Sequence, residues 1–126
     1  MYKDQLFLLP NDFFDNGRQE YCPECAEMWG IINYFPIIKP SLEIIYTSIE
    51  KPRKKLVDMI GYENQNCPTL ILSDISPIYQ NCGLLSVNGY NFLNNVRDIG
   101  RYYFQRFGTS YPRGAWAFII WINFFY

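Results

Sequence analysis

The sequence predicts an α/β fold in which a mixed central sheet is flanked by helices. Short runs rich in Leu, Ile and Phe predict strands, and segments whose apolar residues recur every three to four positions predict amphipathic helices. Proline and glycine separate many of these segments. In addition, a Cys-Pro-Glu-Cys motif at Cys22–Cys25 lies between the first predicted strand and the first predicted helix.

The N-terminal third of the chain predicts a strand, a loop and a helix. The apolar run at residues 4–9 fits a buried strand, and residues 10–21, which contain Pro, Asn, Asp and Gly, fit a loop. In residues 23–35 the apolar side chains fall on one face of a helix. Pro23 is tolerated in the first turn of this helix, and Pro36 ends it.

The middle of the chain predicts a strand, a helix and a strand. Residues 42–49 contain the apolar sequence of the second strand, and residues 52–60 form a basic helix that Gly61 can cap. The sequence Lys51–Lys55 opens this helix and predicts a solvated face. Residues 69–72 predict the third strand.

The C-terminal third predicts a hairpin and a helix. Residues 84–87 and 90–93 flank Asn88-Gly89, a dipeptide typical of tight hairpin turns. A helix follows from about residue 95 to 107, which Asn94 or Asn95 can cap and Gly108 stops. The resulting order is β-α-β-α-β-β-α. Its first strand–helix–strand unit predicts a parallel pair, and its hairpin predicts an antiparallel edge.

Composition excludes several classes of function. The net charge is −1, with 11 basic and 12 acidic residues, so no electrostatic footprint for nucleic acid is expected. Histidine is absent, which excludes Cys-His dyads, His-ligated haem and zinc sites that need histidine. No apolar run near Met1 resembles a signal peptide. We therefore expect a cytoplasmic protein in which disulfides are transient.

Two cysteine motifs resemble those of the thioredoxin-like superfamily. They are Cys22–Cys25 at the first helix and Cys67-Pro68-Thr69 before the third strand, and Tyr21–Cys25 is most similar to the glutaredoxin branch. The similarity covers roughly residues 3–108. Further segments resemble a bacterial family of thioredoxin-like proteins with no assigned function, namely Leu6–Leu9, Glu63–Gln65 and Pro68–Leu72.

The resemblance implies a thiol–disulfide oxidoreductase. Cys22, at the start of a helix, would be the attacking thiolate, because unpaired N–H groups and the helix dipole stabilise negative charge there. Cys25 would resolve the mixed disulfide, and the charge of Glu24 opposes the helix effect. Pro68, implied to be cis, and Thr69 would present backbone groups to a thiol or disulfide substrate, either a protein or a small molecule.

Three questions stay open at this point. Cys67 is a third redox thiol, a ligand completing a zinc or iron–sulfur site with Cys22 and Cys25, or a small semi-buried residue. Glutathione is a candidate co-substrate, but Asn94 and Asn95 stand where glutaredoxin-like sites have aspartates. The chain could also be a non-catalytic binding module that kept the fold. Cys82 is expected to be a bystander, and no metal ligand is assigned.

The C-terminal segment differs from the rest of the chain. Residues 115–126 contain eleven hydrophobic residues of twelve, and only Asn123 is polar. We expect residues 1–114 to form the thioredoxin-like domain and residues 115–126 to be a separate aromatic tail. The tail is too short for a helix that spans a bilayer, which needs about 20 residues. It predicts packing against the domain or a homodimer. Attachment to a membrane surface is a further alternative, although no basic face accompanies the aromatic residues.

Overall fold

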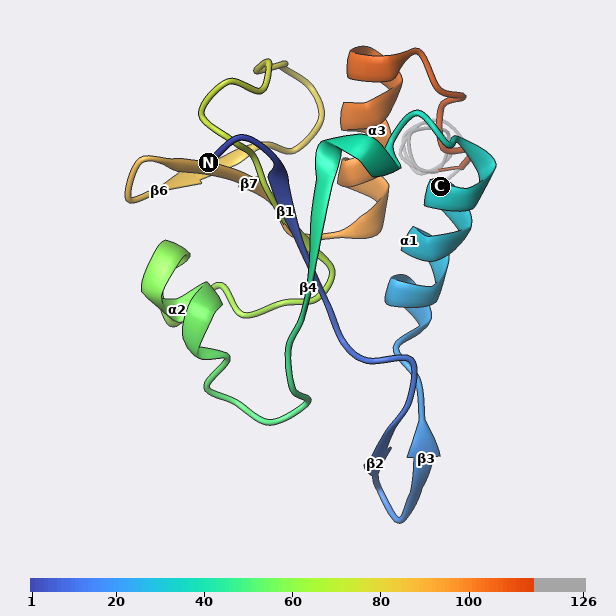
Figure 1. The fold of residues 1–126 in the computed structure, drawn as a ribbon, viewed down its shortest axis with the longest axis vertical. Helices are drawn as coiled ribbons and strands as arrows, with labels where there is room; N and C mark the ends of the chain where they lie inside the picture. The colour runs from blue at the N-terminus through green and yellow to red at the C-terminus, as the bar shows by residue number, and fades with distance from the viewer. Residues whose placement is uncertain (115–126) are drawn as a thin grey trace, which may run out of the picture.

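The computed structural model describes residues 1–114, which form strands and helices in alternation (Figure 1). In chain order these elements are β1 (Asp4–Leu8), β2 (Phe13–Asp15), β3 (Arg18–Glu20), α1 (Pro23–Tyr34), the 3-10 helix η1 (Lys39–Ser41), β4 (Leu42–Tyr46), α2 (Lys54–Ile60), β5 (Thr69–Ile71), β6 (Leu85–Val87), β7 (Tyr90–Leu93) and α3 (Val96–Phe107). The tail at 115–126, and the dimer predicted from it, lie outside the described residues.

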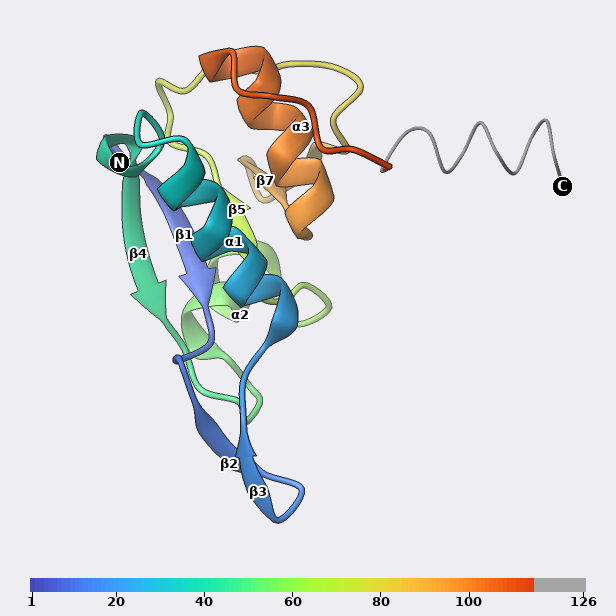
Figure 2. The same ribbon diagram turned by 90° about the vertical axis from the view of Figure 1, so that its right-hand side faces the viewer.

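The central sheet has five strands in the order β4-β1-β5-β7-β6. β1 pairs with β4 in parallel, and the remaining pairs are antiparallel. This confirms the predicted mixed α/β fold, with its parallel first pair and antiparallel edge, and it is consistent with a thioredoxin-like arrangement. Helices α1 and α3 lie side by side on one face of the sheet, and α2 lies on the other face (Figure 2).

The core surrounds β1, which has a neighbour on each side and helices over both faces. Leu6, Phe7 and Leu8 are completely buried, as a strand covered on both faces requires. The helices contribute apolar side chains to the same core, among them Cys25, Met28, Ile32, Leu56, Ile60, Val96, Ile99, Tyr102 and Tyr103. The caps of α3 are those that its sequence favours: the Asn95 side chain accepts from the Asp98 N–H, and Gly108 is left-handed.

The prediction of a loop at residues 10–21 is wrong, because part of this segment is a hairpin. β2 and β3 pair from Phe13↔Glu20 to Asp15↔Arg18. Asn16 and Gly17 form the turn with φ of 52° and 74°, the left-handed conformation that a two-residue hairpin turn needs. The hairpin extends away from the central sheet, below the N-terminal end of α1 (Figure 1).

A buried ion pair joins the first strand to the last helix. Asp4 is completely buried and accepts from the Ser73 N–H at 2.8 Å, the Ser76 hydroxyl at 2.6 Å and the Arg106 guanidinium at 2.5 Å. These bonds satisfy the carboxylate inside an otherwise apolar region. They hold the start of β1 against the end of α3 and against the 73–76 loop.

Two neighbouring tyrosines of α3 differ in how their hydroxyls are satisfied. Tyr102 donates to the Pro77 carbonyl at 2.8 Å, whereas the buried hydroxyl of Tyr103 has no partner within residues 1–114. A buried polar group without a partner destabilises the fold. We expect Tyr103→Phe to leave the free energy of unfolding unchanged or raise it by about 1 kcal/mol, and Tyr102→Phe to lower it by about 1 kcal/mol. Urea denaturation measures both; equal losses would mean that the Tyr103 hydroxyl has a partner.

Candidate functional site

Cys22 occupies the N-cap of α1. Its backbone is extended, with φ −82° and ψ 114°, and its Sγ accepts a hydrogen bond from the Cys25 N–H at 3.2 Å. The side chain therefore lies at the end of the helix where N–H groups are free to stabilise an anion. The thiol is only partly buried, so a reactant can reach it. This is the position that the sequence predicted for an attacking thiolate.

Cys25 lies one turn further along α1 and faces the core, with an exposed fraction of 4%. Burial, reinforced by the neighbouring Cys22, raises the pKa of the Cys25 thiol to about 12. Cys25 is therefore protonated at neutral pH. The two cysteines of the motif thus differ strongly in access to solvent, even though one helical turn separates them.

The Cys67–Thr69 segment lies beside Cys22, as the resemblance implied. The Cys67–Pro68 peptide bond is cis, and the Cys22 Sγ is 3.9 Å from the Cys67 carbonyl oxygen. All three residues of the segment are buried, and the Thr69 hydroxyl donates to the Asn66 carbonyl at 2.6 Å. Burial raises the pKa of the Cys67 thiol to about 11, and Arg53 partly opposes that rise.

Arg53 supports the Cys67 segment from the interior. The prediction of a solvated face for Lys51–Lys55 is wrong at this residue, which is only 7% exposed. Its guanidinium donates to the backbone carbonyls of Ser48 at 2.9 Å, Ile49 at 3.1 Å and Gln65 at 2.6 Å. Arg53 therefore ties the β4–α2 connection to the segment that leads into Cys67.

Glu24, between the two motif cysteines, is directed toward another helix. Its carboxylate accepts a hydrogen bond from the Val96 N–H at 3.2 Å, in the first turn of α3. A carboxylate in this place is favourable for α3, because it meets the positive end of the helix dipole. The motif thus contributes a cap to α3 as well as two thiols.

The cysteines do not assemble into a metal centre in the described part of the chain. Within residues 1–114, no group of three or more His, Cys, Asp or Glu side chains could hold a metal ion. Cys82 is completely buried elsewhere, where its thiol contacts the Tyr79 carbonyl at 3.6 Å. The zinc or iron–sulfur site weighed above therefore gains no support from the described residues, and we derive no chemistry through one.

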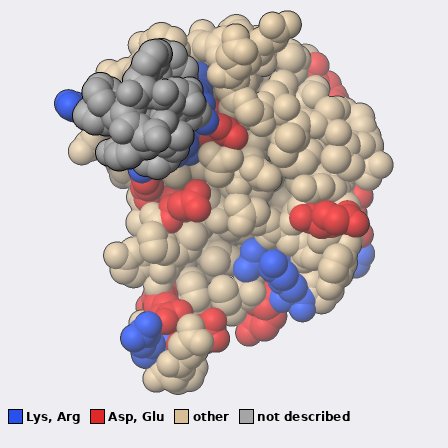
Figure 3. Space-filling model, turned by 180° about the vertical axis from the view of Figure 1, so that it is seen from behind, with Lys and Arg blue, Asp and Glu red and all other residues tan. Residues whose placement is uncertain are grey.

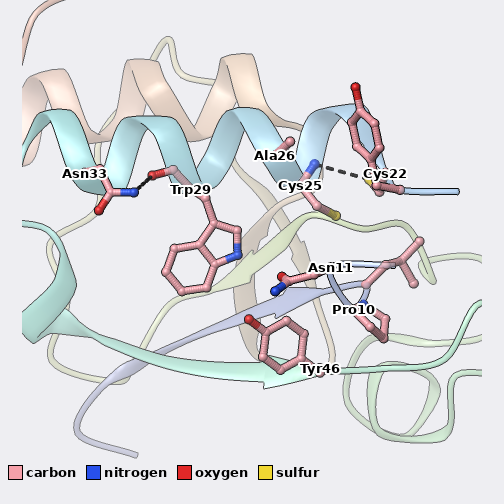
Figure 4. A pocket seen from close by; sticks show the side chains of 10 residues that line it. Pro10, Asn11, Cys22, Cys25, Ala26, Trp29, Asn33 and Tyr46 are labelled. Atoms are coloured by element: carbon pink, nitrogen blue, oxygen red, sulfur yellow. Dashed lines mark hydrogen bonds between the residues drawn. The ribbon is translucent and has the colours of Figure 1, made fainter. Parts of the chain in front are cut away.

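An open groove adjoins the dithiol on the side of β4 (Figure 4). Its volume is about 620 Å³. The Trp29 ring projects from α1 into the groove, and Tyr46, at the end of β4, faces it from the opposite wall. The complete lining is Leu9, Pro10, Asn11, Tyr21, Cys22, Cys25, Ala26, Trp29, Asn33 and Tyr46.

Sequence reasoning missed this groove. The helical spacing assigned Trp29 to the buried stripe of α1, and Tyr46 was only a residue in a predicted strand. In the structure Trp29 is half-buried and Tyr46 is exposed, so both side chains are free to line the groove.

The raised pKa values predict a loss of stability at alkaline pH. From the ordinary value of 9.0, the pKa rises to about 12 at Cys25 and about 11 at Cys67, so the unfolded chain releases these protons first. The resulting stability is fully present below pH 9 and is lost as the pH rises through the folded-state values. Each thiol should lower the free energy of unfolding by at most about 1.4 kcal/mol between pH 9 and 10.

Chemical denaturation at several pH values measures this effect. The matched control is the Cys25→Ala/Cys67→Ala double variant, in which the slope between pH 8 and 10 should become shallower. An unchanged slope would show that neither thiol holds its proton more tightly in the folded state.

The face seen from behind is mostly uncharged and carries scattered acidic and basic side chains (Figure 3). None of the helices in residues 1–114 is long and apolar enough to cross a membrane.

Searches among curated proteins and among solved structures found no match. A family model described as "Protein of unknown function (DUF3088)" matches residues 3–111. This match covers most of the chain, which therefore belongs to the DUF3088 family.

Proposed function

We propose that the protein is a thiol–disulfide oxidoreductase of the thioredoxin-like superfamily, with a glutaredoxin-like dithiol, that works in the reducing cytoplasm. The observation that supports it most is the Cys22 Sγ at the N-cap of α1, 3.2 Å from the Cys25 N–H and beside the Cys67–Pro68 segment. A thiolate in such a position is stabilised and accessible, as the nucleophile of disulfide exchange must be.

The reaction has two steps. The Cys22 thiolate attacks one sulfur of a disulfide; the substrate S–S bond breaks, the first substrate thiolate leaves, and a mixed disulfide forms. Cys25 then loses its proton and attacks the Cys22 sulfur, which releases the second substrate thiol and leaves a Cys22–Cys25 disulfide. The substrate gains two electrons and the protein loses two, and an external dithiol restores the reduced form.

The environment of Cys25 suits the second step. Burial is the main cause of its raised pKa, and the neighbouring Cys22 adds to the rise. Formation of the mixed disulfide consumes the Cys22 thiol and so removes the part of the rise in the pKa of Cys25 that Cys22 causes. The buried Cys25 sulfur then lies one helical turn from the sulfur that it must attack.

Glutathione has weaker support as the co-substrate. Asn94 and Asn95 replace the aspartates of glutaredoxin-like sites. In addition, the Glu24 carboxylate already caps the N-terminus of α3, where an anionic group of a ligand would otherwise find free N–H donors. A different thiol or disulfide, from a protein or a small molecule, is the better supported substrate class.

The test is catalytic turnover of a disulfide. The full chain should accelerate the reduction of insulin disulfides, or of a small disulfide, by dithiothreitol. It should also form a mixed disulfide at Cys22 that mass spectrometry detects. A rate equal to that without protein, with both substrates, would reject the oxidoreductase and leave the binding-module hypothesis.

A further inference from the structure

The dithiol has two flanks, and they differ in shape. In the sheet, β4 and β5 lie on opposite sides of β1. The Cys67–Thr69 segment enters β5, so it bounds the dithiol on one flank, whereas Tyr46 and the groove lie on the β4 flank. When one sulfur of a substrate reaches Cys22, the remainder of the substrate can lie along either flank.

The two flanks offer different amounts of space. On the β5 flank the side chains of Cys67, Pro68 and Thr69 are buried, and the Thr69 hydroxyl is already bonded to the Asn66 carbonyl. On the β4 flank the groove measures about 620 Å³ and includes both motif cysteines in its wall. This volume is within the range of roughly 300–1,000 Å³ that is typical of sites for small molecules.

The lining of the groove is uncharged. Among the residues that the structure describes, those that line it include no Lys, Arg, Asp or Glu. The rings of Trp29 and Tyr46 form its walls, and its polar groups include the side-chain amides of Asn11 and Asn33 (Figure 4) and the phenol hydroxyls of the lining tyrosines. A charged ligand would lose hydration here without gaining a counter-charge.

One cation lies close to a wall of the groove without being part of its lining. The Lys39 ammonium is 5.9 Å from the centroid of the Trp29 ring. At this distance it is attracted to the ring by a cation–π interaction. Lys39 is not among the lining residues, so the wall of the groove itself stays uncharged.

We propose that this groove binds a low-molecular-weight disulfide whose body is uncharged and aromatic or aliphatic, and that it directs one sulfur of this disulfide to Cys22. The inference rests on the proposed oxidoreductase function. The chemistry is the exchange described above, with the apolar group of the substrate between Trp29 and Tyr46 while Cys22 attacks. Glutathione disulfide, with several carboxylates and ammonium groups, is a poor match for this lining.

Two aromatic disulfide reagents that differ in charge test the proposal. Dithiodipyridine is neutral at pH 7, and dithiobis(nitrobenzoate) carries two carboxylates; both release a coloured thiol. The rate of each with the reduced full chain is divided by its rate with 2-mercaptoethanol, an uncharged thiol, which corrects for the difference in intrinsic reactivity between the two reagents. We expect the normalised rate to favour the neutral reagent.

Variants locate the binding site. Trp29→Ala and Tyr46→Ala should each lower the normalised rate with dithiodipyridine by about 2- to 10-fold, the loss expected for one aromatic contact. Tyr46 is 49% exposed, so its removal should leave the fold intact even if Trp29→Ala does not fold. Asn33→Lys, which adds a cation to the wall, should raise the rate with dithiobis(nitrobenzoate).

The control is Lys51→Ala, at an exposed residue near Cys67, which should change neither rate.

The outcomes separate the inference from the proposed function. If the chain turns over disulfides with dithiothreitol but Tyr46→Ala and Asn33→Lys leave both normalised rates unchanged, the groove is not the substrate site. If Lys51→Ala alone lowers the rates, the substrate lies on the β5 flank, and the inference is also wrong. The absence of turnover with any disulfide rejects the oxidoreductase function itself.

Discussion

Cys22→Ser should reduce disulfide turnover to the rate without protein, whereas Cys25→Ser should stop the reaction after its first step. Only Cys22 combines access to solvent with a sulfur at the N-cap of α1. Burial keeps Cys25 and Cys67 protonated at neutral pH, because the pKa is raised to about 12 and about 11. Neither can replace Cys22, because both are buried and Cys22 is the thiol of the motif that a substrate can reach.

The Cys25→Ser variant gives the clearer signature. It should accumulate one substrate thiol per chain as a mixed disulfide with Cys22, which intact-mass measurement detects and dithiothreitol reverses. The control is Cys82→Ala, because Cys82 is buried at a distance from the motif and should not affect turnover. Full turnover by Cys25→Ser would mean that the reaction needs one thiol, and full turnover by Cys22→Ser would exclude the proposed nucleophile.

Arg106→Met should have the largest effect on stability, a loss of about 3–5 kcal/mol in the free energy of unfolding. The substitution removes the only cationic partner of Asp4 in the described part of the chain, and the carboxylate remains completely buried. An uncompensated buried charge is strongly destabilising. The bonds from Ser73 and Ser76 to the carboxylate do not replace the lost positive charge.

An exposed ion pair supplies the matched control. Arg97 and Glu27 pair at 3.1 Å with side chains about half exposed, so Arg97→Met should cost less than about 1 kcal/mol. The double variant Asp4→Asn/Arg106→Met should recover part of the loss, because it removes the buried charge together with its partner. Urea denaturation measures all three. Equal losses for Arg106→Met and Arg97→Met would show that the Asp4 carboxylate is hydrated or neutral.

Local patterns in the sequence were sufficient for the order of the five central-sheet strands and the three α-helices, and for the position of Cys22 and Cys25 at the start of α1. The apolar spacing of α1 and α3, the cap at Asn95 and the turn at Asn88-Gly89 all depend on residues a few positions apart. The position of Cys22 could be predicted for the same reason, because the residues that begin a helix are close together in the sequence. These features could be predicted because short-range sterics and hydrogen bonding determine them.

Short strands mark the limit of this reasoning. β2 and β3 have three residues each, too few to establish an alternating pattern, so their segment was interpreted as a loop. The Asn16-Gly17 turn was the available signal, and it is of the same kind as the Asn88-Gly89 turn that predicted the other hairpin. A turn dipeptide between polar residues is weaker evidence than one between apolar strands.

By itself, the sequence determined the alternation of strands and helices and placed Cys22 and Cys25 at the start of α1. Only the tertiary structure decided that Asp4 and Arg106 form a buried pair, that Arg53 is internal, and that Trp29 and Tyr46 face each other across a groove. The physical reason is the distance in sequence between the partners. Burial of a charge or the opening of a groove depends on which remote segments pack together, and no local pattern encodes that choice.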